Sequence, residues 1–336
     1  MLKLFQSIFG ARPAAGARYD PALVGKAIDR ALDATDPRIR AVAGHRKRLE
    51  PAVVAAIDHV VALVDSLPPA VEASARAYGE DERLAAFFAS VSRMSEVFGA
   101  DRALLDFLDG PDGVADPVHA LLVVERTEKR ILGMALEGEH VQREVAQVQV
   151  SFDKHRLVEP APDAESHRRQ VLRRAFDQLL AVALARITMA AKERESLEAG
   201  QSVLKAKLRA LQGANFGLEA GDAGEPADAA ALEEKLAAIE RDLEAAGTGA
   251  ATLPRHLDLL VDTLGNAREQ VFAQPLAIRM DRLGIRQDEP GGTTVDLSLV
   301  ELRNALGRAI VVLPVTIPHA AIAKRDAIAE ARRLLG

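Results

Sequence analysis

Hydrophobic residues recur every three or four positions from residue 20 to about residue 110, as they do on the buried face of an amphipathic helix. Asp20 and Pro21 introduce this part with a side chain that caps helices and a proline that favours the first helical position. The pattern therefore predicts an all-helical unit of four or five helices. Their expected ranges are 20–36, 50–67, 70–78, 81–98 and 101–108.

The pattern then changes to the two-residue period of strands that are buried on one face. In a first block, residues 118–159, two apolar runs are separated by polar residues at 127–129, where we predict a turn. Strict alternation follows and predicts a half-buried strand. Its apolar positions are Ala146, Val148, Val150 and Phe152.

A second block, residues 275–318, repeats this pattern. A predicted hairpin turn at 304–307 leads into an unbroken apolar run at 309–317, which is typical of a central strand. Pro314 lacks a backbone N–H and therefore places its part of that strand at an edge or a bulge. Neither block can form a stable sheet alone, so we expect one mixed or antiparallel sheet of about six strands built from both.

Between the two β blocks the pattern is helical again, for some fifty residues from about residue 163. The first half, to about residue 191, is apolar nearly all round and should be buried. The second half keeps only a narrow seam, interrupted by Arg194 and Gln201, and a return helix follows a glycine-rich loop at 213–227. The seam predicts an antiparallel coiled coil. Its residues are Leu197, Leu204, Leu208, Leu211, Leu232, Leu236, Ile239 and Leu243.

Together these elements predict an α+β protein that is predominantly helical. An N-terminal helical unit accompanies the sheet, and an antiparallel helical hairpin is inserted between the two β blocks. A last helix is expected at about 320–335. The predicted units are an amphipathic segment and linker at 1–18, a helical domain at 19–112, a split β-rich domain at 113–162 and 253–336, and the hairpin at 163–252.

The first ten residues form a short amphipathic pattern of their own. The residues expected to dock share one side of the helix and comprise Leu2, Leu4, Phe5, Ile8 and Phe9. Polar residues interrupt the apolar run, so the segment does not have the core of a signal peptide. Three interpretations stay open: packing on the protein's own body, docking in a groove of a partner, and shallow binding at a membrane interface.

Composition removes several classes of function. The chain has 336 residues and no cysteine, which excludes disulfides, thiolate nucleophiles and cysteine-ligated metals. Its net charge of −6 and its lack of tryptophan argue against a nucleic-acid partner. No apolar stretch is long enough to span a bilayer. No phosphate-binding loop, nucleophile elbow or paired-histidine zinc motif is present, so we assign no catalytic, cofactor-binding or metal-binding residue.

The densest cluster of basic residues lies in the first turns of the predicted long helix. Its candidate anion-binding residues are Arg168, Arg169, Arg173 and Arg174. The alternative interpretation is a solvated helix face that Asp163 and Glu165 neutralise. Asp58 and His59 are interpreted as a partly buried structural pair. Asp258 and Asp262, four residues apart with His256 nearby, are interpreted as the surface of an amphipathic helix rather than a metal site.

We therefore expect a non-catalytic interaction or scaffold protein of the bacterial cytoplasm, without a cofactor. It would act through the helical hairpin and the N-terminal segment, either on a protein partner or by self-association. Two alternatives stay open. One is an anion-binding protein or enzyme with a site between the sheet and the helices. The other is peripheral membrane association through residues 1–10.

Overall fold

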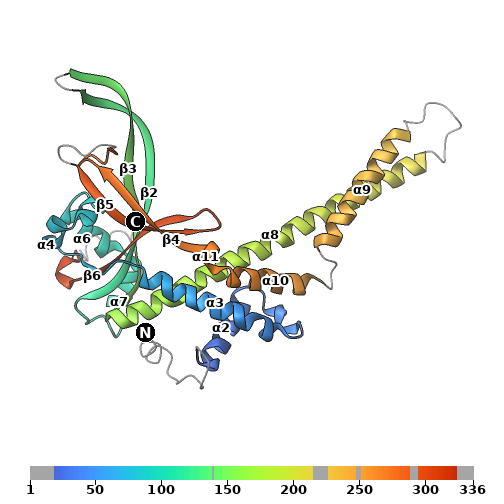
Figure 1. The fold of residues 1–336 in the computed structure, drawn as a ribbon, viewed down its shortest axis with the longest axis horizontal. Helices are drawn as coiled ribbons and strands as arrows, with labels where there is room; N and C mark the ends of the chain where they lie inside the picture. Colours follow the sequence, from blue (N-terminus) through green and yellow to red (C-terminus); the bar gives the residue numbers. More distant parts are fainter. Residues whose placement is uncertain (1–18, 138–139, 215–225, 247–250, 288–293, 324–336) are drawn as a thin grey trace, which may run out of the picture. The chain divides into compact units, whose positions relative to one another are not determined.

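A computed structural model describes residues 19–137, 140–214, 226–246, 251–287 and 294–323 (Figure 1). The described residues form ten α-helices and one six-stranded sheet, and about 58% of these residues are helical, which confirms the predicted α+β class. Contacts divide the chain into two compact units. The first comprises Met1–Ala56 and Asp177–Ala267, and the second comprises Ile57–Phe176 and Arg268–Gly336.

The first unit is entirely helical in its described part. The Asp20 carboxylate accepts a hydrogen bond from the backbone N–H of Ala22, which confirms the predicted N-cap of the first helix. The elements that contribute to this unit are α2 (Pro21–Ala34), the 3-10 helix η1 (Pro37–Ala41), the first half of α3 (His45–Asp65), most of α8 (Ala164–Ala214), α9 (Pro226–Ala246) and α10 (Thr252–Gly265). Leucines of α8 and α10 are among its buried residues, including Leu179, Leu180, Leu257 and Leu260.

The second unit contains the sheet and the short helices. The helices are α4 (Ala75–Glu80), α5 (Glu82–Phe87), α6 (Val91–Ala100), α7 (Arg102–Leu108), most of α11 (Ala267–Gln270) and the 3-10 helix η3 (His319–Ala321). The strands are β1 (Val71–Glu72), β2 (Val118–Glu137), β3 (His140–Ala161), β4 (Val271–Met280), β5 (Val295–Asn304) and β6 (Ala309–Ile317). Their order is β3-β2-β6-β5-β4, antiparallel throughout, with β1 added parallel to β6.

The centre of this sheet is covered on both faces. Leu122 and Leu313 point into a cluster with Phe87, Phe88 and Phe98 of the α5–α6 region. The neighbouring positions along the same strands point into a second cluster, which consists of Leu121, Val123, Val171 and Val312 with Val64 and Leu67 packed against it. Burial of alternate residues on opposite faces explains why β2 and β6 begin as continuous apolar runs.

The turn predicted at 127–129 is wrong. These residues lie inside β2, where Thr127 pairs with Ser151 and Lys129 pairs with Gln149 of β3. β2 contacts β6 only through Val118–Val124, so from there onward β2 and β3 form a two-stranded ribbon. One face of the ribbon is covered here, since Val150 and Phe152 of β3 are buried in the same cluster as Leu122, whereas Glu128 and Lys129 of β2 are exposed. Polar residues are ordinary at such exposed strand positions. Sequence polarity therefore indicated exposure here and not a turn.

The predicted helix at 81–98 is also divided in two. α5 ends at Phe87, and Ser90 begins α6 by accepting a hydrogen bond from the backbone N–H of Arg93 at 3.1 Å. The helix predicted at 50–67 begins earlier, because α3 runs from His45 and includes Pro51. The Ser90 cap decides locally where α6 starts, and apolar spacing does not show such a cap.

The hairpin turn predicted at 304–307 is confirmed, since β5 ends at Asn304 and β6 begins at Ala309. Pro314 lies where β6 changes neighbours. On that side, β5 pairs with β6 only as far as Val312, and β1 begins to pair at Val315. Pro314 therefore has no partner on that side, and its missing N–H costs no ladder hydrogen bond there. Most of the helix expected at 320–335 lies outside the described residues.

Candidate functional site

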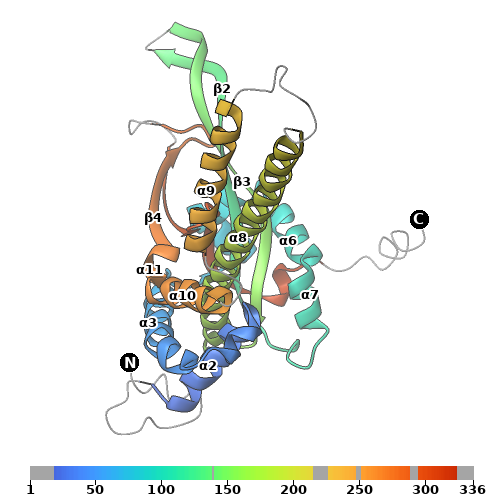
Figure 2. The ribbon, with the colours of Figure 1, turned by 90° about the vertical axis from the view of Figure 1, so that its right-hand side faces the viewer.

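The distal part of α8 and the whole of α9 form the surface that the sequence singles out. In both ribbon views α9 runs back beside the distal half of α8 (Figures 1 and 2). The side-chain amide of Gln201 donates to Glu240 Oε1 at 3.1 Å, and Lys205 Nζ lies 3.2 Å from the same oxygen. A Cβ added to Gly200 would lie 3.4 Å from Ile239 Cδ1, so the side chain of Ile239 packs against α8 at this glycine.

The predicted seam between α8 and α9 is only partly buried. Leu208 is the one seam residue in the described set that counts as buried, with 8% of its surface exposed. The side chain of Leu211 lies outside the described residues. The remaining seam residues are half-buried and comprise Leu197, Leu204, Leu232, Leu236, Ile239 and Leu243. Two helices alone leave the flanks of such a seam open to water, so this helix pair retains apolar surface.

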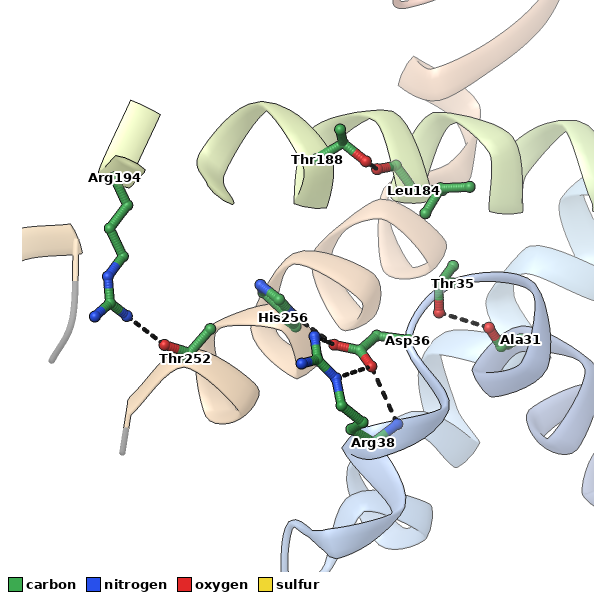
Figure 3. A network of polar contacts seen from close by, with 9 residues as sticks. All are labelled: Ala31, Thr35, Asp36, Arg38, Leu184, Thr188, Arg194, Thr252 and His256. Carbon is green, nitrogen blue, oxygen red and sulfur yellow. Dashed lines mark hydrogen bonds and ion pairs between the residues drawn. The ribbon is translucent and has the colours of Figure 1, made fainter. Parts of the chain in front are cut away.

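The two polar residues that interrupt the seam both have partners. Arg194 Nε lies 2.8 Å from Glu198 Oε1, and its NH1 donates to the hydroxyl of Thr252 at the start of α10 (Figure 3). Gln201 bonds Glu240 as described above. Partnered polar groups carry little desolvation penalty. The seam is therefore weakened by missing apolar contacts rather than by unpaired polar atoms.

A second apolar strip follows the outer side of α8. Met189 and Val203 are 61% and 55% exposed. They are fourteen residues apart, which is two heptads, so both project from one side of the helix roughly 21 Å apart along its axis. Midway between them lies Ser196, a small residue that leaves the strip flat. Large apolar side chains at this spacing are unusual on a solvent-facing helix.

The charges of the two helices are segregated. Residues 199–214 of α8 carry three basic side chains and no acidic one. α9 carries six acidic and two basic residues, a formal net charge of −4. The Lys205–Glu240 ion pair is one result of this separation. The pair therefore presents a basic helix edge and an acidic helix edge beside its apolar seam.

The four candidate arginines at the start of α8 do not converge on one point. Arg168 forms an ion pair with Asp65 of α3, and Arg169 lies 3.5 Å from Glu165 of its own helix. Arg174 NH1 lies 3.0 Å from Glu159 Oε1 of β3, and Arg173 is exposed. Successive helical residues point about 100° apart, so the basic run is divided among different neighbours. Of the four, only Arg174 lines a groove, which is described below.

Sequence reasoning missed a buried polar network in the first unit. The Asp36 carboxylate lies between His256 and Arg38 (Figure 3), and the side chains of Asp36 and His256 are both at least nine-tenths buried. His256 Nδ1 lies 2.7 Å from Asp36 Oδ2, while Arg38 Nε and NH2 donate to the two carboxylate oxygens at 2.9 Å. These bonds, above all those from Arg38, lower the pKa of Asp36 to about 2.

This network joins helices rather than forming a reaction centre. Asp36 follows α2 and caps η1, whereas His256 belongs to α10. Within the described part of the chain, Asp36 is the hydrogen-bond partner of His256, and no hydrogen bond joins a hydroxyl group to this ring. An Asp–His pair without a nucleophile lacks the third group that nucleophilic catalysis requires. Asp36 therefore anchors α10 to the corner between α2 and η1.

The remaining predicted pairs have structural surroundings. The ring nitrogen Nε2 of His59 lies 2.6 Å from the carbonyl oxygen of Val271, and Asp58 also has an interaction partner. Asp258 forms an ion pair with Arg48. No group of three or more potential metal-ligating side chains occurs among the residues that were described. No described helix is long and apolar enough to cross a membrane. The amphipathic segment at 1–10 lies outside the described residues, so its three interpretations stay predictions.

Comparison of the chain with protein-family models, with curated proteins and with solved structures gave no match. Function must therefore be inferred from the residues and their geometry.

Proposed function

We propose that this chain is a non-catalytic interaction protein that self-associates through α9 and the distal half of α8. The observation that carries the proposal is the incomplete burial of the α8–α9 seam, where six of the predicted apolar residues remain half-buried. A coiled coil that leaves its seam open gains stability when further helices cover it. Met189 and Val203 give α8 a second exposed apolar contact, on the side of the helix that faces away from the seam.

The charge pattern favours a second copy of this chain as the occupant. In an arrangement with two-fold symmetry, the basic end of α8 in one copy lies against the acidic α9 of the other, and the same contact is made twice. The three basic residues at 199–214 and the net charge of −4 on α9 supply this complementarity. Opposite charges steer the association and set its register, while the apolar seam supplies most of the affinity.

The contribution of one side chain can be estimated. Complete burial of a valine side chain is worth roughly 1.5–3 kcal/mol. Since Val203 is 55% exposed, its burial contributes about 1 kcal/mol per copy. In a symmetric dimer the residue occurs twice, so introducing a charge at this position affects the interface twice.

Light scattering coupled to size-exclusion chromatography tests this proposal on the full chain. The wild type should form a dimer that dissociates on dilution, and Val203→Asp should be monomeric with unchanged helicity by circular dichroism. Leu283→Asp is the matched control, because Leu283 is 78% exposed in the second unit. A wild type that is monomeric at every concentration contradicts self-association. A Val203→Asp variant that dimerises like the wild type would exclude this surface as the interface.

A further inference from the structure

A groove of about 630 Å³ lies within the second unit, between the α6–α7 corner and β3. This volume is within the usual range for small-molecule sites. Four arginines from four different elements line it: Arg93 of α6, Arg102 of α7, Arg156 of β3 and Arg174 of α8. Such a gathering of arginines is notable in a chain whose net charge is −6.

The side chain of Asp101 holds the two walls of this groove together. Asp101, between α6 and α7, accepts from the backbone N–H of Leu104 at 3.0 Å through one oxygen. Its other oxygen accepts from the backbone N–H of Leu157 in β3 at 2.9 Å. Both carboxylate oxygens are therefore engaged, and the corner is fixed to the strand. Asp101 acts here as a structural link rather than as a competitor for a ligand.

The strand segment along the groove is shaped by two irregularities. Lys154 and Glu159 adopt positive φ angles of 54° and 53°, and the register of β3 against β2 shifts beside each of them. Such bulges redirect the side chains next to them. The stretch between them contributes His155, Arg156 and Leu157 to the groove.

The positive charges in the groove are unequally neutralised. Arg93 lies 3.3 Å from Glu96, and Arg174 lies 3.0 Å from Glu159. Arg102 has a longer contact of 3.7 Å with Asp106, and both of these side chains are largely exposed, so that pair is weak. Arg156 is exposed and forms no ion pair with any described residue. Arg156 and Arg102 are therefore the guanidinium groups that remain to bind an anion.

His155 adds a hydrogen-bond acceptor beside these cations. Its ring stacks on Phe88, and its Nε2 lies 2.6 Å from the carbonyl oxygen of Phe87. A carbonyl oxygen can only accept, so Nε2 carries the proton. Burial lowers the pKa of His155, so the ring is neutral at pH 7 and its Nδ1 keeps a lone pair. Apolar side chains, among them Val97 and Pro160, complete the lining.

We propose that this groove binds a small organic anion, a carboxylate or phosphate monoester that carries an apolar body. Arg156 and Arg102 bind the anionic oxygens, the apolar lining receives the body, and His155 accepts a hydrogen bond from a hydroxyl or N–H of the ligand. Guanidinium groups suit both anions because they donate two parallel hydrogen bonds. Binding here involves no residue of α9 or of distal α8, so it does not depend on self-association.

Isothermal titration calorimetry of the full chain with benzoate and with phenyl phosphate tests this site and separates the two kinds of anion. We expect at least one of them to bind, and Arg156→Gln to weaken that binding roughly 10- to 100-fold, since one charge-assisted contact is lost. Arg173→Gln is the matched control, because Arg173 is an exposed arginine of the same unit that does not line the groove.

Three outcomes would overturn this site. They are no binding of either probe at millimolar concentration, equal affinity in Arg156→Gln and the wild type, and equal losses in Arg156→Gln and Arg173→Gln. The last result would indicate non-specific attraction to positive charge. Because Arg156 is exposed, its replacement should leave the fold intact, which circular dichroism can verify.

Discussion

The buried carboxylate of Asp36 gives a quantitative prediction about stability. Asp36→Asn keeps the shape of the side chain and removes its charge. The variant loses the charge-assisted bonds from Arg38 of η1 and weakens the contact with His256, which links the end of α2 to α10. We expect the first unit to be less stable in this variant and the effect to depend on pH.

The magnitude follows from the pKa of this carboxyl group. Its pKa falls from the ordinary value of 3.8 to about 2, mainly because Arg38 donates to it. Each pKa unit corresponds to about 1.4 kcal/mol, so the charged form stabilises the fold by about 2 kcal/mol. A lowered folded-state pKa means that this contribution is complete above pH 3.8 and is lost as the pH falls to about 2.

Urea unfolding followed by circular dichroism at several pH values measures this effect. At pH 6, Asp36→Asn should reduce the free energy of unfolding by about 2 kcal/mol, and the difference from the wild type should shrink toward zero near pH 2. Asp33→Asn is the control, because its ion pair with Arg40 is largely exposed and worth at most about 1 kcal/mol. A difference that is the same at pH 6 and near pH 2 would refute the electrostatic reasoning.

Two further predictions concern the second unit. Burial lowers the pKa of His155 below 6.5, so the midpoint of its NMR titration should lie below that value. Protonation of His155 should therefore reduce the stability of the fold as the pH falls below 6.5. A midpoint above 6.5 would contradict this prediction. Gly113→Ala should cost about 1–3 kcal/mol in thermal unfolding, because the new Cβ would lie 2.0 Å from the backbone oxygen of Leu108. Gly79→Ala, with nothing within 4 Å, should be neutral or stabilising, and equal melting temperatures for the two variants would disprove the steric argument.

Apolar periodicity predicted the elements of this fold better than their limits. The long helix expected from residue 163 is α8, which begins at Ala164, and the alternation that ends at Phe152 lies in β3. Periodicity succeeded here because each of these elements buries residues on one face over much of its length. It failed at residues 127–129, because exposed polar positions inside β2 have the polarity expected of a turn.

The polar sites were much less accessible to sequence reasoning. His256 and Asp36 are 220 positions apart in the sequence, and no local sequence pattern indicates that they form a hydrogen bond. The groove arginines are similarly scattered, because Arg93, Arg102, Arg156 and Arg174 come from four elements. Only Arg174 was a candidate, since it belonged to a dense basic run. The density of basic residues along the sequence therefore identified only one of the four arginines that the fold brings together in the groove.

The place of β6 in the chain has a consequence for synthesis. This strand lies at the centre of the sheet, where it joins β2 to β5, yet among the described strands it is the last to be synthesised. Roughly 190 residues separate it from its partner in β2, which at 5–20 residues per second corresponds to a delay of roughly 10 to 40 seconds. During that interval the apolar start of β2, buried on both faces in the finished sheet, has an unpaired edge. The nascent chain thus carries an aggregation-prone strand edge until β6 is made.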